Sequence, residues 1–331
     1  MENEKVLEVD NLHVSFQTYA GEVKAVRGVS FELKKGETLA FVGESGCGKT
    51  VTAKAVMRLL KPPFAEIKPE SKIVCNGKDV MKMTDKELYK FRGDEISMIF
   101  QDPMTSLNPT MTIGKQIMES LIIHRGMNKA EARKEAIRML EMVKIPSPES
   151  RIDNYPHELS GGMRQRVMIA IALACNPKIL IADEPTTALD VTIQAQIMDL
   201  LKELQVKEGK SIILITHNMG LVAEMADEVC VMYMGRVVEF GSLEDLFDRT
   251  SHPYTRALLR SVPVLGLADG QKLETIPGAT PNPADLKGGC EFADRCSECM
   301  ERCREETIPM FEVSPGHRVR CLKFDSYPEV D

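Results

Sequence analysis

A short glycine-rich segment, Gly43 to Thr50, has residue types and a spacing that suit the binding of phosphate. It reads Gly-Glu-Ser-Gly-Cys-Gly-Lys-Thr and so matches the phosphate-loop pattern G-x-x-x-x-G-K-[ST]. Glycines let the backbone close around an anion, and the start of a following helix offers free backbone N–H groups. In such a loop Lys49 reaches the β- and γ-phosphates of a nucleotide, and the Thr50 hydroxyl ligates Mg²⁺. A chance match is the alternative, but an apolar strand before the loop and a helix after it favour a nucleotide site.

An acidic pair and a histidine follow buried strands and could complete such a site. Asp183 and Glu184 come directly after the apolar run Ile179 to Ala182, and His217 comes after Ile212 to Thr216. Beside a phosphate loop, Asp183 suits coordination of Mg²⁺ and Glu184 suits a general base for the attacking water. His217 would lie at the same sheet edge and could sense the γ-phosphate. The alternatives are a solvated strand end and a structural histidine, and the phosphate loop upstream argues against both.

A second glycine-rich helix start lies at Leu159 to Gln165, which reads Leu-Ser-Gly-Gly-Met-Arg-Gln. Ser160 suits an N-cap, and Gly161 and Gly162 expose backbone amides ahead of the apolar helix Val167 to Cys175. One chain that binds one nucleotide does not need two such anion sites. We therefore expect the second to serve the nucleotide of another subunit.

The nine cysteines divide into two groups. Four are scattered and suit small buried hydrophobes or incidental thiols: Cys47, Cys75, Cys175 and Cys230. The other five crowd toward the C-terminus: Cys290, Cys296, Cys299, Cys303 and Cys321. In a reducing compartment such a cluster favours a metal site over disulfides.

Composition limits the classes of function. With 331 residues, of which 43% are apolar, the chain can form one large domain or two moderate ones with a substantial core. The formal net charge of -7 argues against a nucleic-acid surface. The N-terminus is acidic and lacks the apolar region of a secretory signal, and no apolar run approaches the roughly 18 residues that span a bilayer. We therefore expect a cytosolic protein whose link to any membrane comes through partners.

Hydrophobic periodicity predicts the elements that position these motifs. Alternation over Leu7 to Glu37 predicts antiparallel strands, and the apolar run Thr38 to Val42 predicts the strand before the phosphate loop. The other predicted strands are Ile73 to Val80 with a turn at Asn76-Gly77, Glu95 to Phe100, Ile179 to Ala182, Ser211 to Thr216, and a hairpin of Val229 to Tyr233 with Arg236 to Phe240. The predicted helices are Val51 to Leu60, Asn128 to Lys144, Val191 to Lys207, Gly220 to Ala226 and His252 to Arg260.

The order of these elements predicts an α/β fold. Buried β-branched runs that alternate with helices indicate a parallel sheet, whose ligands gather at the carboxyl ends of its strands. Pro103 to Pro156 is expected to be a helical insertion with a loop at Met104 to Thr112. Beyond Thr250, prolines and glycines predict a loop-rich appendix.

In order and spacing, the motifs resemble the nucleotide-binding subunit of an ABC transporter over about residues 6 to 245. The resemblance rests on the phosphate loop, Gln101 in Ile-Phe-Gln-Asp, the segments LSGGMRQ and ILIADEP, the step Ala188-Leu189-Asp190, and His217. It implies that the chain binds ATP and Mg²⁺, with Mg²⁺ held near Thr50, Gln101 and Asp183. It also implies that Glu184, His217 and Gln101 support hydrolysis.

The same resemblance implies which residues contact nucleotide. An N-terminal aromatic would stack on adenine, either Phe16 or its rival Tyr19. The phosphate-loop contacts would be Gly43, Ser45, Gly46, Cys47, Gly48, Lys49, Thr50 and Val51. Ser160 and Gly162, with Gly161 between them, would grip the γ-phosphate bound by a partner subunit, and Asp190 would lie at the dimer interface.

The C-terminal part resembles the extension of oligopeptide/dipeptide importer ATPases, much of which nickel importers share. The resemblance rests on His252-Pro253-Tyr254-Thr255-Arg256-Ala257-Leu258, on Ile276-Pro277-Gly278 and on the cysteines. It implies four ligands, Cys290, Cys296, Cys303 and Cys321, with Cys299 as an addition that leaves the ligand set open. Four thiolates suit an iron-sulfur cluster or zinc, and zinc sites favour paired C-x2-4-C motifs, of which Cys296 and Cys299 form one. We therefore expect a [4Fe-4S] cluster with a structural or docking role; Zn²⁺ and free thiols are the alternatives.

Together these resemblances imply an ATPase subunit that powers the import of di- or oligopeptides. Its partners would be a second ABC ATPase subunit, more often a related chain than an identical one, two transmembrane permeases, and indirectly an extracytoplasmic peptide-binding protein. It would lie at the cytoplasmic face of the cell membrane as a peripheral subunit. One alternative keeps the mechanism and transports nickel or another small solute. A distant one, a soluble ABC ATPase that acts on nucleic acid or ribosomes, conflicts with the single cassette and the acidic charge balance.

The implied fold class is α/β. It consists of a P-loop NTPase (ABC ATPase) core with an N-terminal antiparallel β-subdomain, a helical signature subdomain and a small Cys-rich C-terminal extension. The ATPase domain would occupy residues 1-250, with the helical subdomain at about 103-165, and the extension would occupy residues 251-331.

Overall fold

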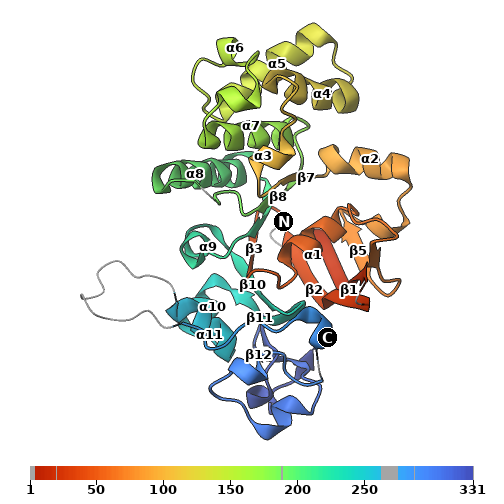
Figure 1. Ribbon diagram of the computed structural model, residues 1–331, viewed down its shortest axis with the longest axis vertical. Helices are drawn as coiled ribbons and strands as arrows, with labels where there is room; N and C mark the ends of the chain where they lie inside the picture. The colour runs from red at the N-terminus through yellow and green to blue at the C-terminus, as the bar shows by residue number, and fades with distance from the viewer. Residues whose placement is uncertain (1–3, 20, 188, 262–274, 287, 331) are drawn as a thin grey trace, which may run out of the picture. The chain divides into compact units, whose positions relative to one another are not determined.

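The computed structural model describes residues 4–19, 21–187, 189–261, 275–286 and 288–330. By its internal contacts the chain forms two compact units, which Figure 1 lets the reader trace by colour along the sequence. The first unit consists of Met1–Val6, Lys34–Glu37 and Lys82–Ile215. The second unit consists of Leu7–Leu33, Thr38–Met81 and Thr216–Asp331. Each unit therefore joins segments that are far apart in the sequence.

The first unit contains parallel strands with a helical crossover. β7 (Ile96–Ile99) pairs in parallel with β8 (Ile179–Asp183), and β8 pairs in parallel with β9 (Ser211–Ile215). β8 and β9 are buried along their whole length, as expected for strands covered on both faces. The chain passes from β8 to β9 through α8 (Val191–Glu208). This arrangement confirms the predicted parallel sheet and places Asp183 at a carboxyl strand end.

Helices make up most of the rest of the first unit. They are α2 (Asp85–Asp94), α3 (Pro103–Ser106), α4 (Ile113–Arg125), α5 (Lys129–Met142), α6 (Pro148–Arg151), the 3-10 helix η2 (Pro156–Glu158) and α7 (Gly161–Leu173). α5 begins with the capping box predicted from Asn128 and Glu131, and α4, α5 and α7 pack together (Figure 1). The prediction of a loop at Met104 to Thr112 is wrong at its start, where the residues belong to the short helix α3. Asp102 caps this helix by accepting from the backbone N–H of Met104. No helix in the described ranges combines the length and the apolar character needed to cross a membrane.

An antiparallel sheet forms the N-terminal part of the second unit. Its order is β2 (Gly21–Lys34), β1 (Lys5–Thr18), β5 (Lys72–Cys75) and β6 (Lys78–Asp79), and β4 (Ala65–Ile67) also pairs with β1. β5 turns into β6 at Asn76 and Gly77, whose φ angles of 46° and 75° suit a tight hairpin. The predicted antiparallel strands and their turn are confirmed.

A second sheet carries the phosphate loop. β3 (Thr38–Val42), buried throughout, lies parallel to β10 (Glu228–Tyr233), which pairs antiparallel with β11 (Arg236–Ser242). The predicted hairpin turn at Met234 and Gly235 has φ angles of 48° and 78°. The helices of this region are α1 (Lys49–Val56), α9 (Met219–Met225), α10 (Leu243–Asp248) and the 3-10 helix η1 (Val80–Lys82), which begins in this unit. α1 ends earlier than the predicted Leu60, and Arg58, just beyond it, has a left-handed φ of 49°.

The C-terminal residues extend this second sheet instead of forming loops alone. β11 pairs with β13 (His317–Val319), then β12 (Met310–Ser314) and β14 (Glu329–Val330) follow in order. The helices here are α11 (Pro253–Arg260) and the 3-10 helices η3 (Pro283–Asp285), η4 (Ala293–Arg295), η5 (Glu301–Arg304) and η6 (Leu322–Phe324). The predicted helix at His252 to Arg260 is confirmed, with His252 as its N-cap. The strands escaped prediction because such short segments show no clear period in the sequence.

Candidate functional site

The phosphate loop connects β3 to α1, and its glycines have conformations that other residues avoid. Gly43 and Gly48 have φ angles of 146° and 106°. A Cβ atom at Gly43 would lie 2.2 Å from the carbonyl oxygen of Met232, and one at Gly48 would lie 2.7 Å from that of Ala25. Conformation and space therefore both require glycine. Within the described part of the chain no side chain caps α1 at Gly48. A helix start without a side-chain cap suits an anion.

Lys49 is held across the loop by carbonyl groups of the loop itself. Its Nζ donates to the carbonyl oxygens of Gly43 at 2.7 Å and Glu44 at 3.0 Å, and the residue is only 6% exposed. The ammonium group thus has a fixed position in the loop, as a phosphate-binding lysine needs. The other predicted loop residues fall into three classes: exposed Ser45 and Gly46, half-buried Thr50 and Val51, and buried Cys47.

The acidic pair lies at the end of β8. Asp183 is only 2% exposed. Glu184 has a left-handed φ of 46°, which is uncommon for a residue other than glycine and costs about 1–3 kcal/mol. Its backbone N–H donates to the carbonyl oxygen of Ile215 at 2.8 Å, which helps hold this conformation. Strained backbone of this kind is typical of functional sites.

The carboxylate of Glu184 is fixed by two neighbours from the same unit. Its Oε2 accepts hydrogen bonds from Nε2 of Gln101 and from Oγ1 of Thr187, each at 2.9 Å. The structure therefore brings Gln101 to Glu184. Thr187 was not predicted from the sequence, although its position three residues after Glu184 in a strand-end turn was a usable signal.

The second glycine-rich helix start is the N-terminus of α7. Oγ of Ser160 accepts from the backbone N–H of Met163 at 3.4 Å, so Ser160 is the predicted N-cap. A Cβ atom at Gly162 would lie 2.7 Å from Cγ2 of Ile193, so the first turn of α7 packs tightly against α8. Asp190 caps α8 by accepting from the backbone N–H of Ile193 at 3.0 Å. Both helix starts therefore lie together, with exposed residues Ser160, Gly161 and Asp190.

The remaining predicted residues are the two aromatics and the histidine. Phe16 is half-buried in β1 opposite Ala65, whereas Tyr19 lies just beyond β1 and is fully exposed. His217 follows β9 and is exposed. The phosphate loop, Phe16, Tyr19 and His217 belong to the second unit; Gln101, the Ser160 to Gly162 segment, Asp183, Glu184 and Asp190 belong to the first. Ala188 lies outside the described residues.

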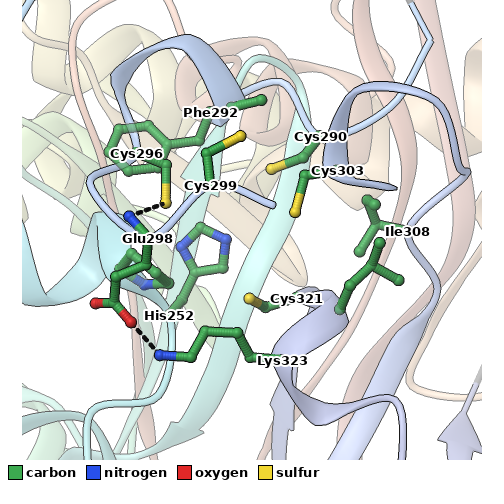
Figure 2. Close-up of a pocket in the computed structure, with 13 residues that line it drawn as sticks. His252, Cys290, Phe292, Cys296, Glu298, Cys299, Cys303, Ile308, Cys321 and Lys323 are labelled. Carbon is green, nitrogen blue, oxygen red and sulfur yellow. Dashed lines mark hydrogen bonds and ion pairs between the residues drawn. The ribbon is translucent and has the colours of Figure 1, made fainter. Parts of the chain in front are cut away.

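The five C-terminal cysteines gather around one cavity of about 20 Å³ (Figure 2). Burial raises the pKa of the Cys290 thiol to about 12 and also raises the pKa values of Cys296, Cys299 and Cys321. Among the residues that the structure describes, no group of His, Cys, Asp and Glu side chains is arranged to hold a metal ion. The predicted gathering of thiols is therefore observed, while the predicted metal site receives no support from the arrangement of the side chains.

Two family profiles match the sequence. The profile described as "ABC transporter" matches residues 26–187, which include the phosphate loop, the α7 start and the acidic pair. The profile described as "Oligopeptide/dipeptide transporter, C-terminal region" matches residues 238–303. The second match includes Cys290 to Cys303 and stops before Cys321.

Curated relatives cover almost the whole chain. The dipeptide transport ATP-binding protein DppD of Bacillus subtilis (strain 168) is 53% identical over 326 residues, which span 98% of this chain and 97% of that protein. The oligopeptide transport ATP-binding protein OppD of the same strain is 54% identical over 316 residues, which span 96% of this chain and 88% of that protein. Among solved structures, the dimeric post-hydrolysis state of the ATP-binding cassette MJ0796 bound to ADP and Pi matches with a TM-score of 0.64 and 31% identity. That match covers 72% of this chain and 98% of the other.

Proposed function

The chain belongs to the family of dipeptide and oligopeptide transport ATP-binding proteins of ABC transporters, and from this premise we propose that it hydrolyses ATP to power the import of di- or oligopeptides. The observation that carries the proposal is the strand-end residue Glu184. Its backbone is strained and its carboxylate accepts hydrogen bonds from Gln101 and Thr187, in a chain that also contains a phosphate loop. The C-terminal profile match supports peptides as the transported solute.

In this proposal the phosphate loop binds the nucleotide and Glu184 activates water. The backbone amides of the loop and the Lys49 ammonium bind the phosphates, and Phe16 or Tyr19 stacks on adenine. The Glu184 carboxylate accepts a proton from the water that attacks the γ-phosphate, Gln101 orients that carboxylate and the water, and His217 contacts the γ-phosphate. Positioning and charge stabilisation supply most of the acceleration.

The donor set suits Mg²⁺. The hydroxyl of Thr50, the carboxylate of Asp183 and the amide oxygen of Gln101 are the hard oxygen ligands that this ion prefers. Asp183 is buried at the end of β8, and a bound Mg²⁺ would offset part of the desolvation of its carboxylate. When bound, Mg²⁺ neutralises charge that develops on the phosphates. We assign the site to these three residues.

The α7 start is proposed to act on the nucleotide of a second ATPase subunit. Support comes from the exposure of Ser160, Gly161 and Asp190, and from the dimeric state of the matched cassette structure. Ser160 and Gly162 would contact the γ-phosphate across the interface. We propose a related chain rather than an identical one as the natural partner.

The further partners follow from the family. We propose two transmembrane permeases as direct partners and an extracytoplasmic peptide-binding protein as an indirect one, with this chain peripheral at the cytoplasmic face of the membrane. Residues 1-250 would form the ATPase domain and 251-331 the extension. Co-purification of the complex and identification of the ligand held by its binding protein tests the solute, and a nickel ion there would overturn the peptide assignment.

We propose that four of the five clustered thiols of the extension hold a [4Fe-4S] cluster with a structural role. The chemistry of the donor set supports this proposal, because thiolates ligate such clusters and these thiols line a single cavity. Cys290, Cys296, Cys303 and Cys321 would be the ligands, and Zn²⁺ is the alternative. Assays of iron, sulfide and zinc after purification without oxygen decide between them, since zinc alone would overturn the cluster.

The catalytic assignment is tested with Glu184→Gln. This variant should retain ATP binding and accumulate an ATP-bound dimer with the partner subunit, while steady-state hydrolysis falls by about a hundredfold or more. Phosphate release measures hydrolysis, and light scattering measures the dimer. Glu149→Gln, an exposed glutamate of the same unit, serves as the matched control and should leave both unchanged. Undiminished hydrolysis in Glu184→Gln would refute Glu184 as the base.

A further inference from the structure

We infer that the C-terminal extension holds the phosphate loop in its ATP-binding conformation through Glu44, with Arg295 and Tyr254 as positioning residues. Glu44 occupies a variable position of the loop pattern, and the pattern by itself assigns it no role. The inference rests on the proposed binding of ATP by the loop. It depends neither on the transported solute nor on any group bound by the cysteines.

The carboxylate of Glu44 forms a bidentate ion pair with the guanidinium of Arg295. Nη1 of Arg295 donates to Oε2 at 2.6 Å, and Nη2 donates to Oε1 at 2.9 Å. Oγ1 of Thr280 donates to the same Oε2 at 3.0 Å. Pairs of this geometry are among the strongest and most directional polar contacts in proteins. The guanidinium holds the pKa of the Glu44 carboxyl below its usual range, so the pair is charged at neutral pH.

Arg295 is itself fixed within the extension. Its side chain is 5% exposed, against 25% for that of Glu44. Its Nε donates to the carbonyl oxygen of Pro277 at 2.9 Å, and its Nη1 also donates to the hydroxyl of Tyr233 at 3.2 Å. The guanidinium lies 5.9 Å from the ring centroid of Phe292. Arg295 is therefore a rigid anchor, and the more exposed loop is the part that it restrains.

The backbone of Glu44 is held as well, and this contact leads directly to Lys49. The backbone N–H of Glu44 donates to the hydroxyl of Tyr254 at 2.8 Å, while its carbonyl oxygen accepts from Nζ of Lys49 at 3.0 Å. Tyr254 is completely buried in α11 and packs against Tyr233 and Phe292. The extension thus fixes the carboxylate and the backbone of the residue on which the phosphate-binding lysine rests.

This arrangement gives the extension a role in the chemistry of the loop. A loop that already has its bound shape loses less conformational entropy when it takes up nucleotide. The position of the Lys49 ammonium also matters, because small displacements of a positioned group have large effects on phosphate chemistry. Loss of the Glu44–Arg295 pair should therefore weaken the binding of Mg–ATP without removing any group that touches it.

The test is a double-mutant cycle on the full-length chain with Glu44→Ala, Arg295→Ala and the double variant. The dissociation constant for Mg–ATP is measured by calorimetry, and unfolding temperatures are measured without nucleotide. Each single variant should bind Mg–ATP about tenfold more weakly, and the double variant no more weakly than the worse single one. In the assembled transporter the KM for ATP should rise more than kcat falls.

Two further variants serve as a control and as a substitute for a variant that does not fold. Arg256→Ala breaks another half-buried ion pair of the extension, Arg256–Glu298 at 2.7 Å, and should leave the affinity for Mg–ATP within twofold of that of the unaltered chain. Glu44→Gln removes the charge of the more exposed partner of the ion pair. If Arg295→Ala does not fold, this variant tests whether loss of the charged pair weakens the binding of Mg–ATP. Lower unfolding temperatures with unchanged affinity would show that the pair only stabilises the fold. Independent, multiplying effects in the cycle would likewise overturn the inference.

Discussion

The two glycine-rich helix starts look alike in sequence but are completed in different ways. In the described structure, α1 begins at Gly48 without a capping side chain, whereas α7 begins at Ser160, whose hydroxyl accepts the backbone N–H of Met163. Lys49, the first residue of α1, is 6% exposed and rests on loop carbonyls. Ser160 is exposed. The start of α1 therefore carries a buried lysine held by loop carbonyls, while the start of α7 carries an exposed serine that caps its own helix.

Similar sequence patterns can therefore take different roles. A helix start beside a fixed lysine suits the binding of phosphate, and in the described structure no side chain caps the start of α1. A helix start whose backbone N–H is already used by a capping side chain has fewer donors for an anion. Such an exposed start suits contact with a ligand that is bound by another surface. This agrees with the proposal that the loop binds nucleotide within the chain and the α7 start acts on that of a partner.

The largest expected effect separates the two helix starts by nucleotide affinity. Lys49→Ala should weaken Mg–ATP binding by the isolated chain about a hundredfold, because several charge-assisted contacts are lost. Ser160→Ala should leave that affinity unchanged and lower hydrolysis only in the assembled dimer. Calorimetry on the isolated chain and phosphate release from the complex measure these effects.

The matched control for Lys49 is Lys54, which lies in the last turn of the same helix. Lys54→Ala changes the charge of the protein equally and should leave Mg–ATP affinity within twofold. Equal loss of affinity in the isolated chain for Ser160→Ala and Lys49→Ala would contradict the division of roles.

A smaller effect concerns the packing of the α7 start. Gly162→Ala should lower the free energy of unfolding by about 1–2 kcal/mol relative to Gly161→Ala. A Cβ atom at Gly162 would meet Cγ2 of Ile193 at 2.7 Å, whereas one at Gly161 would meet Leu189 at 3.8 Å, an ordinary contact. Both variants gain the same helix propensity, so the difference isolates packing. Denaturant titration measures it, and equal stabilities would show that the two helices can shift apart at no cost.

The smallest effect is a pH dependence of stability that arises at His252, the N-cap of the helix that contacts the phosphate loop. Burial lowers the pKa of His252 to about 4, despite the nearby carboxylates of Glu239 and Glu291, and Arg256 lowers it further. Nδ1 of His252 accepts from the backbone N–H of Tyr254 at 3.0 Å, so protonation disturbs the helix that holds Glu44. The unfolded chain, with an ordinary histidine pKa of about 6.5, binds more protons in this range. Stability is therefore lost as pH falls below that value, by about 1 kcal/mol between pH 7 and pH 5.5.

Denaturant titrations at the two pH values measure this loss. His252→Asn keeps an N-cap acceptor without a titrating ring, and its loss of stability over the same interval should be smaller by about 1 kcal/mol. An equal loss in both proteins would assign the acid sensitivity to other groups.

Local patterns predicted the central elements well. The predicted strand Thr38 to Val42 has the same first and last residues as β3. Its bounds were predictable because the run is apolar and a glycine follows it directly. The capping box at Asn128 and the turn at Met234-Gly235 were also predicted, since both depend on neighbours in sequence. The prediction of a loop just after Asp102 was wrong, because the Asp102 cap and Pro103 are enough to form one helical turn. The roles of the site residues stay predictions.

The phosphate loop, the acidic strand end, the second glycine-rich start and the family could be predicted from the sequence, because each depends on residue types at short, fixed spacings. The contacts that hold the phosphate loop from outside became visible only in the folded chain. Arg295 and Tyr254 reach Glu44 from positions far along the chain, and the strands β12 to β14 form by pairing at the edge of β11. Contacts between distant residues leave no periodic trace in either partner. For that reason the link from the extension to the nucleotide loop becomes visible only when the chain is folded.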